Sequence, residues 1–323
     1  AMRTVSIIAC NNGLGHVKRS CLLYDALVDL GIEVTIYGNY ERVRTFIESR
    51  KGSIMPIVQN ISGLPSGQDY LSVGLDSFND IFKDLSELLD GSLVISDNYF
   101  EPFLYGSTGI LLANFLWSDL AGESFGFDIV KKLRTKKCKV LTTKFGKPYF
   151  EGALQINLFG APKEQKVSLG YTLVCKGFGD WNVGFEERLE EFFANETRTT
   201  NSEQQYLYVD RNIPYQNWFS DYDVRILEQG ISEDMIGNAD RIVGRPSLGI
   251  VTDSLAAKVP FIPVYAPGDV ESTYNHSVLT KIYQSTGILN IDCSLMRIKM
   301  ENIDFGLGGE KQLAELIHEE LKK

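Results

Sequence analysis

Short apolar runs alternate with helix-like patterns along most of this chain. The first example is the run Val5–Ala9, which leads into a glycine-containing turn and then into apolar residues at helical spacing between Leu22 and Leu30. Compact apolar runs predict buried strands, whereas apolar residues three or four positions apart predict amphipathic helices. Because alternation of the two is typical of βαβ units, we predict an α/β fold built on parallel sheets.

The same pattern predicts the remaining elements. Further strands are expected at 33–37, 54–58, 93–96, 110–114, 171–175, 206–209, 224–227, 241–243 and 261–264. Further helices are expected at 41–49, 78–89, 185–193, 232–238, 248–257, 274–285 and 311–321. The segments 63–74 and 195–205 are rich in small and polar residues, which predicts loops.

The pattern lapses between positions 160 and 166 and then starts again. We therefore predict a Rossmann-like domain over 1–162 and a second one over 163–323, whose last helix can pack back on the first domain. A chain of 323 residues is long enough for two such cores.

Charge and hydropathy limit the classes of partner. The net charge of −10 argues against nucleic acid as a partner, because such binding needs a basic surface. No apolar stretch approaches a membrane span, the opening residues lack a signal-peptide pattern, and the five cysteines form no close pair. We therefore expect a cytoplasmic protein.

One segment departs from the acidic average. Six basic residues stand between Lys131 and Lys139. They can contact an anionic lipid or an acceptor phosphate, which would place the protein peripherally at the inner membrane face. The alternative is a solvated helix face.

The turn after the first strand carries glycines and a histidine. It runs Gly-Leu-Gly-His-Val-Lys-Arg-Ser from position 13 to position 20 and opens a helix. Free N–H groups at a helix start favour an anion, and ligands of open α/β sheets bind at the carboxyl ends of strands. Gly13 and Gly15 are thus expected to line a site with His16 as a general base, since an imidazole suits proton transfer near neutral pH. A purely structural role for the glycines is the alternative.

A second strand, turn and helix start spans positions 239 to 253. Ser247 is predicted to cap the helix, so that the N–H groups of Leu248 and Gly249 face a diphosphate. Asp253 offers two acceptor oxygens to ribose hydroxyls. Arg245 belongs to the same expected anion site. The alternative is a capped helix that only packs on its sheet.

Two residues after other strands are also candidates. Asp97 ends one strand and can orient His16 or an acceptor hydroxyl. Trp117 follows the next strand, and its ring can stack on an acceptor sugar or pack in the core.

Both turns resemble motifs of one enzyme group. The first is similar to the G-x-G-H-x-x-R loop of MurG-like GT-B glycosyltransferases, and also to that of UDP-sugar hydrolases of the PseG type. The second resembles the donor-binding signature of the same glycosyltransferases, with a Leu-Ala-x-x-x-Pro stretch at 255–260 and a polar loop at 267–275. This resemblance implies two Rossmann-like domains that face a cleft, with the acceptor on the first and a nucleotide sugar on the second.

The resemblance also implies roles for single residues. Asp253 would bind the ribose, Glu271 and Ser272 would meet the sugar hydroxyls, and Asn275 matches the asparagine that follows. In addition, the backbone near Ile231 would contact the base, and two glycines of the second domain would line the cleft, Gly177 and Gly179. Asn11 and Asn12 replace the first glycine pair of the MurG-like loop.

These observations predict a metal-independent glycosyltransferase. It would move a sugar from a nucleotide-sugar donor, with a UDP-sugar the first expectation, to a glycan, lipid-carrier or small-molecule acceptor. No HExxH motif is present, and we expect neither a metal nor another cofactor. Two alternatives remain: a nucleotide-sugar hydrolase of the PseG type, and a non-catalytic partner subunit that binds nucleotide sugars.

Overall fold

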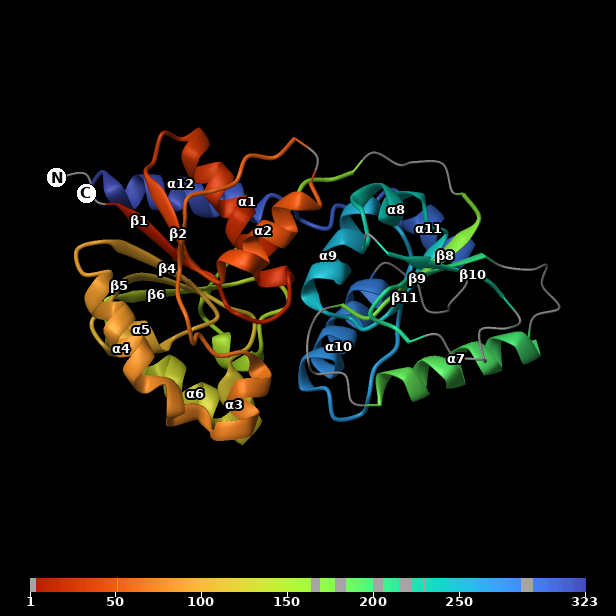
Figure 1. Ribbon diagram of the computed structural model, residues 1–323, viewed down its shortest axis with the longest axis horizontal. Coiled ribbons are helices and arrows are strands. Elements are labelled where there is room, and N and C mark those ends of the chain that lie inside the picture. The colour runs from red at the N-terminus through yellow and green to blue at the C-terminus, as the bar shows by residue number, and fades with distance from the viewer. Residues whose placement is uncertain are drawn as a thin grey trace. The chain divides into compact units, whose positions relative to one another are not determined.

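The computed structural model describes residues 4–50, 52–163, 169–177, 184–199, 206–214, 222–228, 230–285 and 293–323. The chain divides into two compact units (Figure 1). Unit 1 comprises Ala1–Phe159 together with Gly308–Lys323, and unit 2 comprises Gly160–Leu307.

Unit 1 is built on a seven-stranded parallel sheet with the strand order β3-β2-β1-β4-β5-β6-β7. Its strands are β1 (Val5–Ile8), β2 (Val34–Gly38), β3 (Val58–Asn60), β4 (Leu93–Asp97), β5 (Thr108–Leu112), β6 (Cys138–Thr142) and β7 (Leu154–Gln155). Because β1 and β4 are buried along their whole length, the central strands are nearly continuous apolar runs.

Helices cover both faces of this sheet (Figure 1). One face carries α1 (Gly15–Asp29), α2 (Tyr40–Glu48) and α12 (Gly309–Leu321). The other carries α3 (Gly67–Val73), α4 (Asn79–Leu88), α5 (Glu101–Leu104) and α6 (Glu123–Leu133), with the 3₁₀ turns η1 (Leu75–Phe78), η2 (Trp117–Ala121) and η3 (Pro148–Phe150) between elements.

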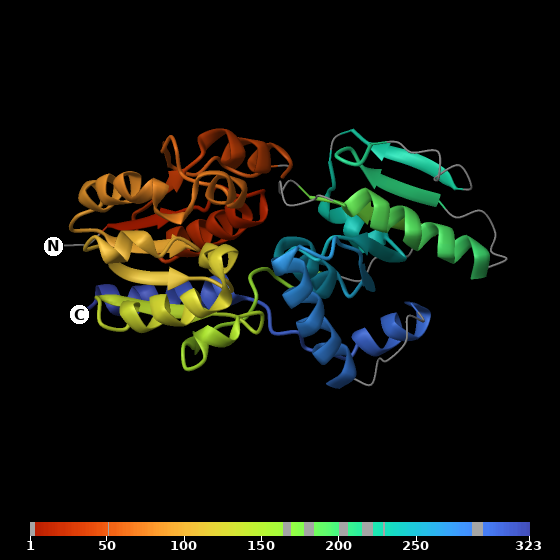
Figure 2. The same ribbon diagram turned by 90° about the horizontal axis from the view of Figure 1, so that it is seen from below.

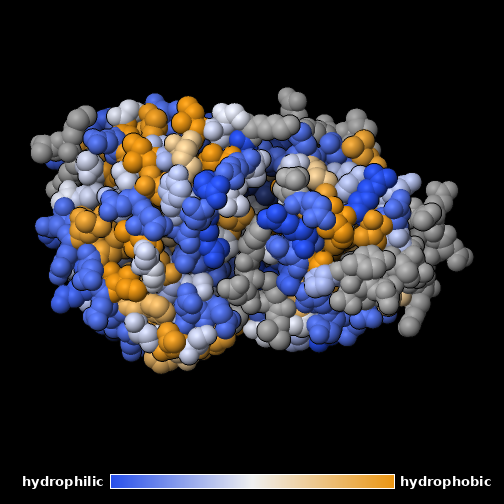
Figure 3. Space-filling model, viewed as in Figure 1, coloured by the Kyte–Doolittle hydropathy of each residue, from blue (hydrophilic) through white to orange (hydrophobic). Residues whose placement is uncertain are grey.

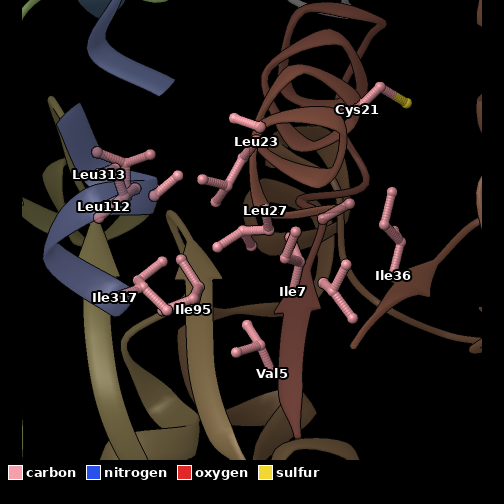
Figure 4. Packing of buried hydrophobic residues seen from close by; sticks show 14 of the residues in the cluster. Val5, Ile7, Cys21, Leu23, Leu27, Ile36, Ile95, Leu112, Leu313 and Ile317 are labelled. Carbon is pink, nitrogen blue, oxygen red and sulfur yellow. The ribbon is translucent and has the colours of Figure 1, made fainter. Parts of the chain in front are cut away.

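The end of the chain belongs to the core of unit 1. Leu313 and Ile317 of α12 lie over Ile95 of β4 and Leu112 of β5, beside Leu27 of α1 (Figure 4). Each such buried side chain contributes about 1.5–3 kcal/mol relative to exposure. The helix α12 therefore closes one face of the sheet around the first unit's own core.

Unit 2 contains a five-stranded parallel sheet with the order β10-β9-β8-β11-β12. The strands are β8 (Tyr171–Cys175), β9 (Tyr206–Asp210), β10 (Asp223–Leu227), β11 (Arg241–Gly244) and β12 (Phe261–Pro263). The helices are α7 (Phe185–Thr199), α8 (Glu233–Asn238), α9 (Leu248–Ala257), α10 (Val270–Ser285) and α11 (Cys293–Met300). The helix α7, drawn in green in Figure 2, lies along this sheet. It packs on the sheet through Phe185, Leu189 and Phe193.

The predicted loop at 63–74 is wrong, because α3 lies within it. The Ser66 side chain accepts from the backbone N of Asp69, whose carboxylate accepts from the backbone N of Ser66. This capping box and the buried ring of Tyr70 stabilise a helix that the glycine and proline content argues against.

Other boundaries also move. The strand predicted at 54–58 lies later, at β3, because Pro56 cannot donate to a ladder. The helix α7 continues into the predicted loop 195–205, of which residues 200–205 lie outside the described residues. In addition, α10 begins at Val270 rather than at position 274.

Within the described ranges, no helix combines the length and apolar character needed to cross a membrane.

Candidate functional site

Both sheets reverse their strand order beside their first strand. In unit 1 the chain passes from β1 outward to β2 and β3 and then returns to β4, and in unit 2 it does the same from β8 to β11. At such a switch point the following loops leave in opposite directions and open a crevice at the carboxyl ends of the two strands, where ligands bind. The expected functional turns follow β1 and β11, so each lies at the switch point of its own sheet.

At the switch point of unit 1 three charged or titratable side chains lie together. Nδ1 of His16 lies 3.2 Å from Oδ1 of Asp97, although 81 positions separate the two residues. Nη2 of Arg19 donates to the same carboxylate oxygen at 2.7 Å and lies 2.8 Å from Nδ1 of His16. The structure thus places both expected catalytic residues side by side and adds Arg19, which follows His16 by three positions in the same turn of α1.

Asp97 is an ionised carboxylate in a buried place. Burial raises its pKa, but the charges of Arg19 and His16 outweigh burial and hold the pKa of Asp97 below its usual range. Its second oxygen, Oδ2, is buried and has no hydrogen-bond partner among the described residues.

The residue after Asp97 fixes the end of β4. Asn98 has a left-handed backbone with a φ of 71° and is 2% exposed. Its amide donates to the carbonyl O of Phe115 at 2.7 Å and accepts from Nε1 of Trp117 at 3.1 Å in the orientation that satisfies both neighbours. Asparagine tolerates this backbone region better than most residues, which is a signal that the sequence analysis did not use.

Trp117 is a core residue rather than an acceptor platform. Its ring is 5% exposed and stacks at 6.3 Å on Tyr70. A Cβ at Gly67 would lie 2.4 Å from the Trp117 ring. Position 67 must therefore be glycine for the start of α3 to pack against this ring.

The turn between β1 and α1 is held from several sides. Gly13 has a positive φ of 64°, and Nη1 of Arg42 donates to its carbonyl at 3.3 Å. The side chain of Asn11 donates to the carbonyl of Leu64 at 2.9 Å, and that of Asn12 accepts from the backbone N of Gly67 at 3.3 Å. The two asparagines that depart from the MurG-like loop therefore tie this turn to the start of α3, while Gly15 begins α1.

Glu101, which begins α5, is a buried acid whose side chain is bonded to a tyrosine. Its Oε1 accepts from the hydroxyl of Tyr70 at 2.9 Å, while its Oε2 is buried without a partner among the described residues. Burial raises the pKa of Glu101 to about 7.

We expect Glu101→Gln to stabilise the protein at alkaline pH. A raised folded-state pKa means that stability is lost as pH rises from the ordinary pKa of 4.5 towards about 7, because the unfolded chain ionises over this range while the buried carboxyl keeps its proton. Above about pH 7 the folded protein holds a buried charge, and the full cost persists. The variant removes that cost, on the order of 3 kcal/mol at pH 8, and has no such advantage at pH 4. Thermal unfolding at both pH values checks it, with the exposed Glu87→Gln as the matched control; an equal effect of both variants at pH 8 contradicts it.

At the switch point of unit 2 the helix α9 begins without a side-chain cap. Ser247 is the N-cap residue of α9, but its side chain makes no capping hydrogen bond. Leu248 and Gly249 form the first turn, and α9 has no acidic residue there. The backbone N–H groups of this turn are therefore suited to an oxyanion.

Gly244, which ends β11, allows a close approach between β11 and β8. A Cβ at Gly244 would lie 2.1 Å from the carbonyl O of Cys175 at the end of β8. The turn after β11 can thus lie against the end of β8 only with glycine at this position.

A buried ionic network stands beside this helix start. Nε and Nη2 of Arg245 donate to the two carboxylate oxygens of Asp269 at 2.6 and 3.2 Å, and Nη2 also donates to Glu271 at 3.1 Å. Burial lowers the pKa of Arg245, but the carboxylates of Glu271 and Asp269 raise it by more. The net pKa is therefore above its usual value, and the guanidinium stays charged. The Asp269 carboxylate also accepts from the backbone N and the hydroxyl of Ser272.

Several residues expected to bind the donor instead bind other groups of the protein. The side chains of Arg245 and Ser272 both donate hydrogen bonds to Asp269, a residue that the sequence patterns did not single out. The amide of Asn275 donates to the carbonyl of Pro246 at 2.9 Å and so ties α10 to the turn before α9. Glu271, with a side chain that is 13% exposed, keeps acceptor capacity for a ligand.

The remaining expected residues follow the neighbouring strands. The backbone N–H of Gly177, after β8, donates to Asp210 at 3.2 Å, so a carboxylate of the protein already occupies that donor. Asp253 of α9 and Asp210 lie near the Cys175 thiol, whose pKa burial and these two charges raise well above its usual value. Ile231 is half-buried and follows β10, whereas Gly179 lies outside the described residues.

The basic segment lies at the end of α6 and the start of β6. All six basic side chains are exposed, and Nζ of Lys139 lies 3.2 Å from Glu320 of α12. Figure 3 shows hydrophobic residues towards the lower edge of unit 1. Exposed hydrophobic side chains of unit 1 include Leu71 and Val73 of α3 and Phe125 and Phe127 of α6. Contact with a membrane or an acceptor phosphate stays a prediction.

No group of three or more His, Cys, Asp or Glu side chains suited to a metal ion occurs among the described residues.

Neither a protein-family model nor a curated protein matches the chain. Solved structures do match it over nearly its full length. The glycosyltransferase SnogD from Streptomyces nogalater is 16% identical with a TM-score of 0.58, over 99% of this chain and 100% of that one. MurG from Acinetobacter baumannii is 14% identical with a TM-score of 0.59, over 99% and 100% of the two chains.

This protein has the GT-B fold. The prediction of two Rossmann-like α/β domains is thereby confirmed, and the MurG-like resemblance extends to the three-dimensional structure. A third match is the glycosyltransferase SsfS6 of a Streptomyces species, complexed with thymidine diphosphate, at 14% identity and a TM-score of 0.56 over 99% and 100% of the chains. The resemblance to PseG-type hydrolases stays a prediction.

Proposed function

We propose that this protein is a metal-independent glycosyltransferase that uses a nucleotide-sugar donor. The observation that carries the proposal is the pairing of His16 with Asp97 at 3.2 Å, at the switch point of a GT-B unit. Glycosyltransferases with this fold, among them SnogD and MurG, match the whole chain and support the same conclusion. Unit 1 would bind the acceptor and unit 2 the donor.

The donor is proposed to bind at the switch point of unit 2. The open first turn of α9, at Leu248 and Gly249, suits the diphosphate because its N–H groups have no side-chain cap. Glu271 is held by Arg245 on one side, and its remaining lone pairs would accept from sugar hydroxyls. Helix dipole and N–H groups would then stabilise the charge that develops on the leaving diphosphate.

The chemical step is proposed to use His16 as the base. The acceptor hydroxyl gives its proton to Nε2 of His16 while its oxygen bonds to the anomeric carbon. The bond from that carbon to the diphosphate oxygen breaks, and its electron pair leaves with the nucleoside diphosphate. Asp97 would orient the ring and stabilise the imidazolium that forms.

Nucleoside diphosphates are expected to protect the protein against unfolding. At a concentration about 100 times the dissociation constant, a ligand of the folded state stabilises it by about 2.7 kcal/mol. Thermal shift measurements with UDP, dTDP, GDP and CMP, and with their sugars, check this expectation and identify the base. If none of these nucleotides raises the melting temperature, the proposed function is wrong.

The same donor site would serve the predicted hydrolase, in which water replaces the acceptor. Incubation of the protective nucleotide sugar without an acceptor separates the two reactions. Transferase activity requires an added acceptor hydroxyl, whereas free sugar formed in its absence identifies a hydrolase.

A further inference from the structure

Two groups compete for one ring nitrogen of His16. Nδ1 lies 2.8 Å from Nη2 of Arg19 and 3.2 Å from Oδ1 of Asp97. An imidazole nitrogen has one in-plane bonding direction, along which it either donates a proton or accepts through its lone pair. Nδ1 therefore cannot donate to Asp97 and accept from Arg19 at the same time.

The distances favour acceptance from Arg19. If Nδ1 carried the proton, its N–H would lie 2.8 Å from Nη2 of Arg19, which is also a donor, and the two donors would repel each other. A lone pair there instead receives a charge-assisted bond from the guanidinium, and this contact is shorter than the one to the carboxylate. Asp97 meanwhile has its own donor, because Arg19 lies 2.7 Å from the same oxygen. A neutral His16 ring in this arrangement carries its proton on Nε2.

That tautomer cannot act as the base. Nε2 would have to receive the acceptor's proton, and in this state it already holds one. For His16 to work, Arg19 must leave Nδ1, so that a proton on Nδ1 donates to Asp97 and the Nε2 lone pair becomes available.

We propose that Arg19 holds His16 in its non-basic tautomer until an oxyanion group of the acceptor binds the guanidinium. This inference rests on the proposed role of His16. The Arg19 side chain is 17% exposed and so can be reached by a ligand, and its Nε is buried without a partner among the described residues. A phosphate or carboxylate accepts two N–H bonds from one guanidinium and is a better partner than a ring nitrogen. Arg19 is thus a positioning residue that couples acceptor charge to base activity.

Nitrogen NMR of the histidine side chains tests the proposal without a known substrate. The His16 signals are assigned by their loss in His16→Gln. In the wild-type protein we expect the proton on Nε2, and in Arg19→Met we expect it on Nδ1, facing Asp97. Arg42→Met is the matched control, because the Arg42 guanidinium donates to the Gly13 carbonyl of the same turn and its loss should leave the His16 tautomer unchanged.

Inorganic phosphate supplies the second measurement, which is made on the wild-type protein and therefore decides even if Arg19→Met fails to fold. Phosphate should move the wild-type His16 proton from Nε2 to Nδ1, and chloride at equal ionic strength should not. A proton on Nδ1 in the ligand-free wild type, or a tautomer that phosphate leaves unchanged, overturns the proposal. Nucleotide protection of the protein would be unaffected by that outcome, so the proposed function is judged separately.

Discussion

Replacement of His16 with glutamine should lower kcat about 100- to 10,000-fold, the usual contribution of a positioned general base. Glutamine keeps a polar side chain of similar length but cannot take the acceptor's proton. Since the donor is proposed to bind in unit 2, nucleotide protection should stay at the wild-type level. Initial rates with the nucleotide sugar that protects the protein, together with thermal shifts, check both parts.

His318→Gln is the matched control for that measurement. His318 lies in the last turn of α12, and its loss should leave kcat unchanged. Full turnover by His16→Gln would remove this histidine from the chemical step and leave the nucleotide-binding proposal intact.

Replacement of Arg245 with methionine is expected to destabilise unit 2 by about 3–5 kcal/mol, the usual cost of leaving a buried charge without its partner. The guanidinium is 6% exposed and is the cation between the carboxylates of Asp269 and Glu271. Without it, the buried carboxylate of Asp269 and the partly buried carboxylate of Glu271 lose the cation between them and repel each other. Hydrogen exchange of the α9 and β11 amides measures the loss within unit 2, where a single melting temperature for two units would not.

The exposed pair of Arg188 and Glu191 supplies the control for this prediction. Arg188→Met removes a surface ion pair on α7, where the expected loss is below about 0.5 kcal/mol. In the Arg245→Met background, Asp269→Asn combined with Glu271→Gln should recover part of the loss, because the charge repulsion disappears. Equal losses for Arg245→Met and Arg188→Met would show that the network contributes no more than a surface pair.

The sequence by itself determined the class of fold and the two turns that matter. Val5–Ile8 and Tyr171–Cys175 are mostly apolar runs that are buried on both faces, which requires a sheet covered on both sides. The glycines and the serine that follow such strands mark helix starts, because cap and turn preferences act between residues close in sequence. The predicted elements of both Rossmann-like units rest on these local effects.

The tertiary structure alone decided which strands are neighbours and which side chains meet. Asp97 reaches His16 because β4 pairs with β1, and Arg245 meets Asp269 because the chain returns to the same edge after β12. The helix at 67–73 forms in spite of its composition, since Tyr70 is buried and bonded to Glu101. Strand order, ion-pair partners and tautomers depend on groups far apart in the chain, whose contacts are set by packing of the whole unit rather than by any local pattern.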